Sequence, residues 1–108
     1  MKSCITLSLV PSLKGGPWVL WDDLENGIKQ AASLGFDAIE LFTNGPNIGP
    51  PGQLNELLSE NNITLGAVGT GAGKVIHGLT LTHPDEGIRQ KAISFIEEMI
   101  DFGAENNA

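Results

Sequence analysis

The sequence predicts an α/β protein made of three successive βα units with parallel strands. Apolar or alternating runs predict strands at residues 5–10, 38–42 and 63–70, and a stretch with helical spacing of its apolar side chains follows each of them. Connections of this length join parallel strands through right-handed crossovers. A chain of 108 residues, 41% of them hydrophobic, has room for one domain with a modest core.

The first strand leads into a long loop. Residues 5–10 alternate apolar and hydroxyl side chains, which is typical of a strand with two different faces. Pro11 ends this strand, and residues 11–20 form a glycine- and proline-rich connection of the kind that often carries function. Trp18 lies in this loop, where an aromatic ring either packs over the rim of the core or stacks on a ligand.

The second strand has a charged residue among apolar ones. The helix before it is predicted at residues 22–34, with acids in its first turn, and Gly35 stands where a left-handed residue closes a helix. Gly27 in the helix interior costs about 1 kcal/mol relative to alanine. Glu40 carries its charge in the middle of the strand, so it needs a partner or a solvated position. We expect it at the carboxyl end of the strand and name it as a candidate site residue.

A short second helix precedes the third strand. Its predicted buried stripe consists of Leu54, Leu57 and Leu58. Asn61 and Asn62 are its expected stop, because asparagine is favoured at helix ends.

A glycine-rich stretch, residues 69–74, follows the third strand and invites comparison with phosphate-binding loops. A Walker A motif requires glycine where Val68 stands and serine or threonine where Val75 stands. The dinucleotide fingerprint requires glycine in the place of Lys74. Both nucleotide-binding interpretations are therefore disfavoured.

The last helix is expected to open at residues 83–86, with His83 at its cap and Pro84 at its first position. Residues 75–82 are expected to be a crossover segment. The helix ends at or near Gly103. Its predicted buried stripe contains Ile88, Ala92, Phe95, Ile96 and Met99.

Charge and cysteine content limit the classes of partner. Six basic and thirteen acidic residues give a net charge of −7, which disfavours nucleic-acid binding. One lysine or helix N-terminus still suffices for a small anionic substrate. Cys4 is the only cysteine and has no evident activating neighbour, so we expect a structural thiol in a reducing compartment. No secretory signal or membrane span is predicted, and a cytoplasmic location follows.

The order of the elements predicts part of a larger barrel. Successive right-handed βα units without a reversal place every helix on the same face of the sheet, as in a (β/α)8 TIM barrel, which needs about 250 residues. Three such units cannot close. We therefore expect residues 1–108 to be a single partial domain, the N-terminal part of a longer protein. Its inner face, including Ser8, Glu40 and Phe42, is expected to lie open to water.

Four segments resemble a known family. Residues 5–10, 35–42, 67–73 and 77–85 are similar to the sugar phosphate isomerase/epimerases of the xylose-isomerase-like barrel superfamily. The Gly-Phe-Asp-Ala-Ile-Glu pattern in the second segment is common to the superfamily, whereas the Gly-Thr-Gly-Ala-Gly pattern is narrower. His83 departs from the pattern, since relatives tend to have aspartate or serine there, and this difference concerns helix capping rather than chemistry.

The resemblance implies a metal-assisted isomerisation or epimerisation of a sugar or sugar phosphate in carbohydrate metabolism. Carboxylates move a proton next to a carbonyl while a divalent cation (Mn, Mg, Co or Zn) polarises the oxygens. In this family the metal ligands and the proton-moving acids lie on later strands. The resemblance therefore implies that these 108 residues contain no catalytic residue, bind no metal and are inactive alone.

Under this resemblance the chain supplies part of the substrate wall, at the carboxyl ends of strands and in the loops after them. The candidate substrate-binding residues are Glu40, His77, Thr70, Lys74 and Trp18. Two of them have alternative roles. Glu40 either contacts the substrate or pairs with a base from a neighbouring strand, and His77 either contacts the substrate or is a solvent-facing loop residue.

Two other functions stay open at this point. One is an apurinic-endonuclease-like barrel of the same superfamily, which the acidic charge and the lack of basic loops disfavour. The other is a non-catalytic module that associates with a second copy of itself. Self-association is expected because both edge strands have unpaired backbone groups and the inner face exposes Val10 and Phe42.

Overall fold

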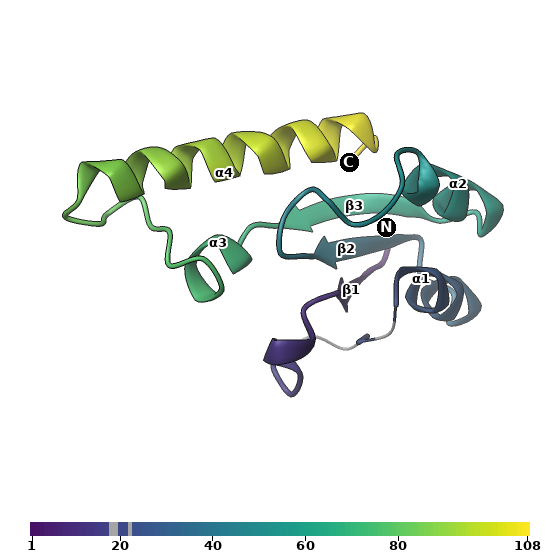
Figure 1. Ribbon diagram of the computed structural model, residues 1–108. Helices are drawn as coiled ribbons and strands as arrows, with labels where there is room; N and C mark the ends of the chain where they lie inside the picture. Colours follow the sequence, from purple (N-terminus) through teal and green to yellow (C-terminus); the bar gives the residue numbers. More distant parts are fainter. Residues whose placement is uncertain (18–19, 22) are drawn as a thin grey trace.

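The computed structural model describes residues 1–17, 20–21 and 23–108, and it contains one parallel three-stranded sheet (Figure 1). The strands are β1 (Cys4–Ser8), β2 (Ala38–Phe42) and β3 (Thr64–Gly69), in the spatial order β1-β2-β3. The helices are α1 (Leu24–Ser33), α2 (Gln53–Glu60), α3 (Ala72–Val75) and α4 (Glu86–Glu105), with a 3₁₀ turn η1 (Pro11–Leu13) after β1. The predicted fold class, successive βα units with parallel strands, is confirmed.

The main hydrophobic core lies between one face of the sheet and the helices α1 and α2. We call this the outer face. Leu7, Ile39 and Leu41 point into it and are completely buried. Full burial of such a side chain contributes about 1.5–3 kcal/mol, so these strand residues anchor the helices on the sheet. The buried members of the core are Ile5, Leu7, Leu20, Leu24, Ile28, Ala31, Ile39, Leu41, Leu54, Leu57, Leu58, Ile63, Leu65 and Phe102.

Gly27 explains how closely α1 packs on β1. A methyl group at this position would lie 2.6 Å from Leu7 Cδ2 and 3.1 Å from Leu7 Cγ, inside the contact distance of carbon atoms. Leu7 is completely buried, and the dense packing of a protein core leaves few voids into which such a side chain could shift. The glycine that is unfavourable for an isolated helix is therefore required by the contact between helix and strand.

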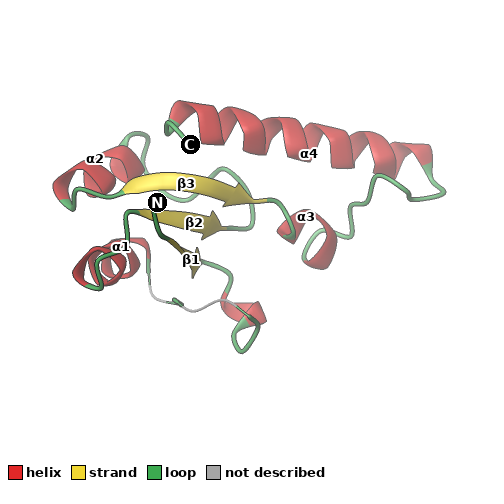
Figure 2. Ribbon diagram, turned by 180° about the vertical axis from the view of Figure 1, so that it is seen from behind, coloured by secondary structure: helices red, strands yellow, loops and turns green. Residues whose placement is uncertain are grey.

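A second, smaller cluster covers the opposite, inner face at the carboxyl end of the sheet. Val10, Phe42 and Ala72 form it, and Leu13 packs against them. In Figures 1 and 2, η1 and α3 lie just beyond the arrowheads of the strands. Leu13 of η1 and Ala72 of α3 belong to the group of side chains that packs with Phe42.

This cluster corrects the expectation of an open inner face. The exposed fractions of Ser8, Val10 and Phe42 are only 1%, 1% and 6%. The prediction was wrong because it treated the chain after each strand as a simple connection. Those connections fold back as a 3₁₀ turn and a short helix, and they bury the apolar end of the inner face.

The glycine-rich stretch makes room for two phenylalanine rings. A methyl group at Gly69 would lie 2.9 Å from the Phe42 ring, and one at Gly71 would lie 3.1 Å from it. A methyl group at Gly73 would lie 2.8 Å from the Phe95 ring. Packing against the two rings accounts for these glycines. This agrees with the sequence, which matches neither the Walker A motif nor the dinucleotide fingerprint.

The outer edge of β1 is covered by the chain's own backbone. Ser8 N–H donates to the Leu20 carbonyl at 2.9 Å, and Leu20 N–H donates to the Thr6 carbonyl at 3.2 Å, so that Leu20 forms a parallel bridge to Leu7. The expectation of an unpaired edge at β1 was therefore wrong. Within the described part of the chain, β3 pairs with β2 alone, and its other edge is free.

Most predicted element boundaries agree with the structure, but the start of α4 differs. Its cap is Asp85, whose Oδ1 accepts from the Ile88 N–H at 3.1 Å, while His83 and Pro84 precede the helix. A carboxylate is a stronger acceptor for these N–H groups than an imidazole nitrogen. His83 Nδ1 instead accepts from the Asp85 N–H at 3.0 Å. The helix also continues through Gly103 to Glu105.

Candidate functional site

Glu40 lies on the inner face, in the middle of β2. We expected it at the carboxyl end of this strand, which is two residues further on. The strand is a regular apolar run, so the residues on either side of Glu40 point into the main core while its carboxylate points the other way. Glu40 is half-buried. Thr6 lies opposite it in the register of β1 and β2 and donates its hydroxyl to Glu40 Oε2 at 2.6 Å.

The surroundings of Glu40 on the β3 side are small and open. The register between β2 and β3 shifts at this point, so that Ile39 pairs with Leu65 but Glu40 pairs with Ala67. The extra residue is Gly66, and both Gly66 and Ala67 are exposed. A bulge of this kind bends a strand and is common next to binding sites. The residues beside Glu40 on β3 are thus small and accessible.

No base neutralises Glu40 in the described part of the chain. The ion pair found there joins Lys29 to Glu25 on the exposed side of α1. The alternative role of Glu40 was an ion pair with a base on a neighbouring strand, but neither β1 nor β3 provides a base. Its hydrogen-bond partner is instead the neutral hydroxyl of Thr6. No basic side chain of the described residues competes with a ligand for this carboxylate.

Cys4 lies near Glu40 and is not activated. Burial raises the pKa of the Cys4 thiol above its usual value, and the negative charge of Glu40 raises this pKa further. The thiolate, which is the nucleophilic form, is disfavoured by both effects. A structural role for this single cysteine, as predicted, agrees with these effects.

His77 connects two loops at the carboxyl end of the sheet. In the tautomer that carries its proton on Nε2, it donates to the Asn44 carbonyl at 2.7 Å. Its ring also lies 5.7 Å from the ring of Phe95 on α4, at a tilted angle of 57°. His77 is exposed, and these two contacts fix its orientation. The loop after β2 is thereby tied to the chain that follows α3.

Thr70 and Lys74 come together beside Phe95, the ring that His77 also contacts. Both line a small cavity of about 90 Å³ between α3 and α4, whose wall includes Phe95. Neither Glu40 nor His77 lines this cavity. Trp18, the fifth candidate, lies outside the described residues. The structure therefore does not gather the four candidates that it describes in one pocket, although His77 contacts a wall of the cavity that two of them line.

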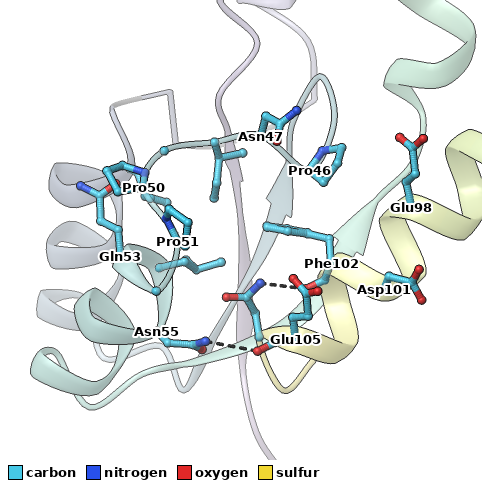
Figure 3. Close-up of a pocket in the computed structure, with 16 residues that line it drawn as sticks. Pro46, Asn47, Pro50, Pro51, Gln53, Asn55, Glu98, Asp101, Phe102 and Glu105 are labelled. Carbon is cyan, nitrogen blue, oxygen red and sulfur yellow. Dashed lines mark hydrogen bonds between the residues drawn. The ribbon is translucent and has the colours of Figure 1, made fainter.

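The sequence did not predict a larger cleft on the outer side of the molecule. It has a volume of about 430 Å³ and lies between the loop before α2 and the C-terminal half of α4 (Figure 3). The Asn55 side chain crosses its floor and donates to the Glu105 carbonyl at 3.2 Å. Three carboxylates and no basic side chain belong to its lining, namely Glu98, Asp101 and Glu105. From the sequence, Glu98 and Asp101 were expected only on the solvated face of the last helix, together with Glu97.

The described residues do not fit a divalent metal by themselves. A metal site needs several carboxylate, imidazole or thiolate ligands that converge on one point. The described ranges contain no group of three or more such side chains close enough to hold an ion. Among the described residues, Glu40 belongs to no such group.

Comparison with known proteins places these observations in a family. The model of the xylose isomerase-like TIM barrel family matches residues 28–108, which is more than half of the chain. A search of curated proteins gave no match. No helix among the described residues is long and apolar enough to cross a membrane.

Proposed function

Because the chain belongs to the xylose isomerase-like TIM barrel family, we propose that it forms part of the barrel wall of an enzyme that isomerises or epimerises a sugar or sugar phosphate. In this proposal the 108 residues contribute three βα units to a longer barrel, and further strands contribute the proton-moving acids and a divalent metal. The proposed location is cytoplasmic, which a single unpaired cysteine supports.

Glu40 carries the proposal. Sugars present many hydroxyl donors, and an ionised carboxylate is the acceptor that binds them most strongly. One oxygen of Glu40 is held by Thr6 at 2.6 Å, and the residues next to Glu40 on β3, Gly66 and Ala67, are small and exposed. A carboxylate fixed in this way can accept a hydrogen bond from a substrate hydroxyl and still keep its hydrogen bond from Thr6.

The net charge of −7 argues against the apurinic-endonuclease alternative, because DNA binding depends on neutralising phosphates with basic side chains. The residues around Glu40 on the inner face are uncharged hydroxyl, thiol and small side chains. Lys74, the lysine among the candidate residues, lies in a different place, at the cavity between α3 and α4. A small polyol suits the inner face better than a nucleic acid does.

The substitution Glu40→Gln tests the proposal in a longer protein that contains these residues and turns over a sugar. We expect kcat/KM to fall by at least about tenfold, which corresponds to about 1.4 kcal/mol, because the amide loses the charge that strengthens the bond to the substrate hydroxyl. The melting temperature should change little, because the amide oxygen still accepts from Thr6. Steady-state kinetics and thermal unfolding measure the two effects.

Glu25→Gln is the matched control, because it removes the same charge from the exposed face of α1, where Glu25 pairs with Lys29. It should leave kcat/KM unchanged. If Glu40→Gln kept its turnover and only lowered the melting temperature, Glu40 would be a structural residue and the proposal would fail. Equal losses in both variants would point to a general effect of charge.

The isolated 108-residue chain should neither turn over sugars nor gain stability from Mn²⁺. An ion present at about one hundred times its dissociation constant stabilises a folded protein by about 2.7 kcal/mol, so binding would appear as a clear rise in melting temperature. We expect no such rise. A metal-dependent shift, or turnover that survives repurification and is abolished by Glu40→Gln, would show that these residues hold a complete site.

A further inference from the structure

Two Asn-Gly pairs occur in the sequence, Asn26-Gly27 and Asn44-Gly45. Asparagine is among the thermolabile residues of proteins, because its side-chain amide can be lost to attack by the next backbone nitrogen. Glycine in the next position favours this reaction, since it has no side chain to shield its nitrogen. The structure holds the two pairs in opposite ways, so it distinguishes between them.

The pair in α1 is held at both reacting groups. The Asn26 side chain donates from Nδ2 to Asp23 Oδ2 at 2.7 Å, which fixes the amide that would be attacked. The Gly27 N–H donates to the Asp23 carbonyl at 2.8 Å, so the attacking nitrogen is engaged in the first turn of the helix. Gly27 is also buried, against Leu7. Bringing the two groups together requires both hydrogen bonds to break.

The pair after β2 is not held at these groups. Asn44 is exposed, and it lies with Gly45 in the irregular loop between β2 and α2. Within the described part of the chain, neither the Asn44 side chain nor the Gly45 N–H takes part in a hydrogen bond. A methyl group at Gly45 would meet no atom beyond the neighbouring residues within 4 Å, so the space around this residue is open.

The same loop is anchored through its oxygens. The Asn44 carbonyl accepts from His77 Nε2 at 2.7 Å, and the Gly45 carbonyl accepts from the Thr43 hydroxyl at 3.0 Å. Both bonds leave the Asn44 side chain and the Gly45 nitrogen available to each other. Neither bond involves an edge of the sheet, so these contacts do not depend on which strands follow β3.

We propose that Asn44 is the first asparagine of this chain to deamidate, while the fold protects Asn26. The Gly45 nitrogen loses its proton and forms a bond to Asn44 Cγ. The bond from Cγ to Nδ2 breaks, and the amide group leaves with that proton as ammonia. Water then opens the succinimide. Opening at Cγ leaves aspartate, and opening at the backbone carbonyl leaves isoaspartate, in which the main chain runs through the former side chain.

Both products change the loop at the carboxyl end of the sheet. Each adds one negative charge to a chain whose net charge is −7. The isoaspartate also turns the backbone carbonyl of residue 44, the acceptor of His77, into a free carboxylate, and it lengthens the main chain by one methylene group. Deamidation therefore alters the link between the loop after β2 and the chain that follows α3.

Peptide mapping by mass spectrometry tests the proposal, after the purified 108-residue chain has been incubated at mildly alkaline pH. Trypsin cleaves after Lys29, between the two pairs, so each pair is measured in its own peptide, and fragmentation assigns the residue. We expect Asn44 to convert at least about tenfold faster than Asn26. Equal rates at the two pairs, or faster conversion of any other asparagine, would overturn the proposal.

Denaturation in guanidinium chloride separates the effect of the fold from that of the sequence. Asn26 and Asn44 should react at similar rates in the unfolded chain, because the bonds to Asp23 are lost there. If the difference between the two asparagines persisted after unfolding, the fold would not be its cause and the proposal would fail.

Gly45→Ala is the variant that tests the attacking nitrogen. Its methyl group enters open space, and Gly45 is not among the glycines with positive φ, so the fold should be kept. The methyl group shields the nitrogen, and conversion of Asn44 should slow by at least about tenfold. An unchanged rate at Asn44 would contradict attack by this nitrogen and overturn the proposal.

Discussion

Replacing Phe42 with alanine is expected to lower the free energy of unfolding by about 3–5 kcal/mol, the usual cost of removing a buried aromatic side chain. Phe42 is 6% exposed and is the largest member of the cluster that closes the inner face. The surrounding positions cannot fill the space, because two of its neighbours are Gly69 and Gly71. A domain of this size has a total stability of about 5–15 kcal/mol, so the variant should lie close to the unfolding threshold.

Urea denaturation at low protein concentration measures this loss. Phe36→Ala is the matched control, because Phe36 is only partly buried at the border of the main core. We expect the control to lose about 1 kcal/mol, within the common range for substitutions of this kind. Similar losses in the two variants would mean that the inner cluster contributes no more than a surface contact, and that the carboxyl end of the inner face is open after all.

Local signals predicted most of the elements. The strand Ala38–Phe42 has the boundaries that its apolar run indicated, and the stripe Leu54, Leu57 and Leu58 is buried on α2. Gly35 has φ +85°, the left-handed conformation expected at the end of a helix. Each of these features depends on residues within about one or two helical turns, which is the range over which periodicity and end signals act.

Features that depend on distant contacts could not be predicted in the same way. The bridge between Leu20 and Leu7 joins a loop to a strand edge, and nothing in the loop's composition indicates it. The helix α3 is only four residues long, and its first residue, Ala72, packs in the same cluster as Phe42. For α4, proline indicated a start at residue 84, but the carboxylate of Asp85 provides the actual cap.

The sequence predicted individual candidate residues, but it did not predict which of them lie next to one another. Glu40 was identified because a charge in an apolar strand is unusual, and the structure places it on the inner face. Its partner Thr6 was missed, although a usable signal existed: the alternation of β1 puts Thr6 on the face opposite Leu7, and parallel pairing brings it across from Glu40. The outer cleft gave no signal, since its walls come from three separate segments.

Gly27→Ala is expected to destabilise the protein by about 1–3 kcal/mol, the typical cost of adding a methyl group to a filled core. Helix propensity alone predicts the opposite, a gain of about 1 kcal/mol. The steric effect should win because the methyl group would lie 2.6 Å from Leu7 Cδ2, and Leu7 is completely buried against β2 and α1. Thermal or urea unfolding measures the sign directly.

Gly103→Ala provides the contrasting control in the same fold. Gly103 is also inside a helix, but a methyl group there would meet Val68 at 3.5 Å and Ala108 at 3.6 Å, which are ordinary contacts. This variant should gain about 0.5–1 kcal/mol from helix propensity alone. Opposite signs at the two glycines would establish that Gly27 is retained for the approach of α1 to β1. A gain at both positions would mean that Leu7 can move aside, and that the packing of α1 on the sheet is looser than the structure indicates.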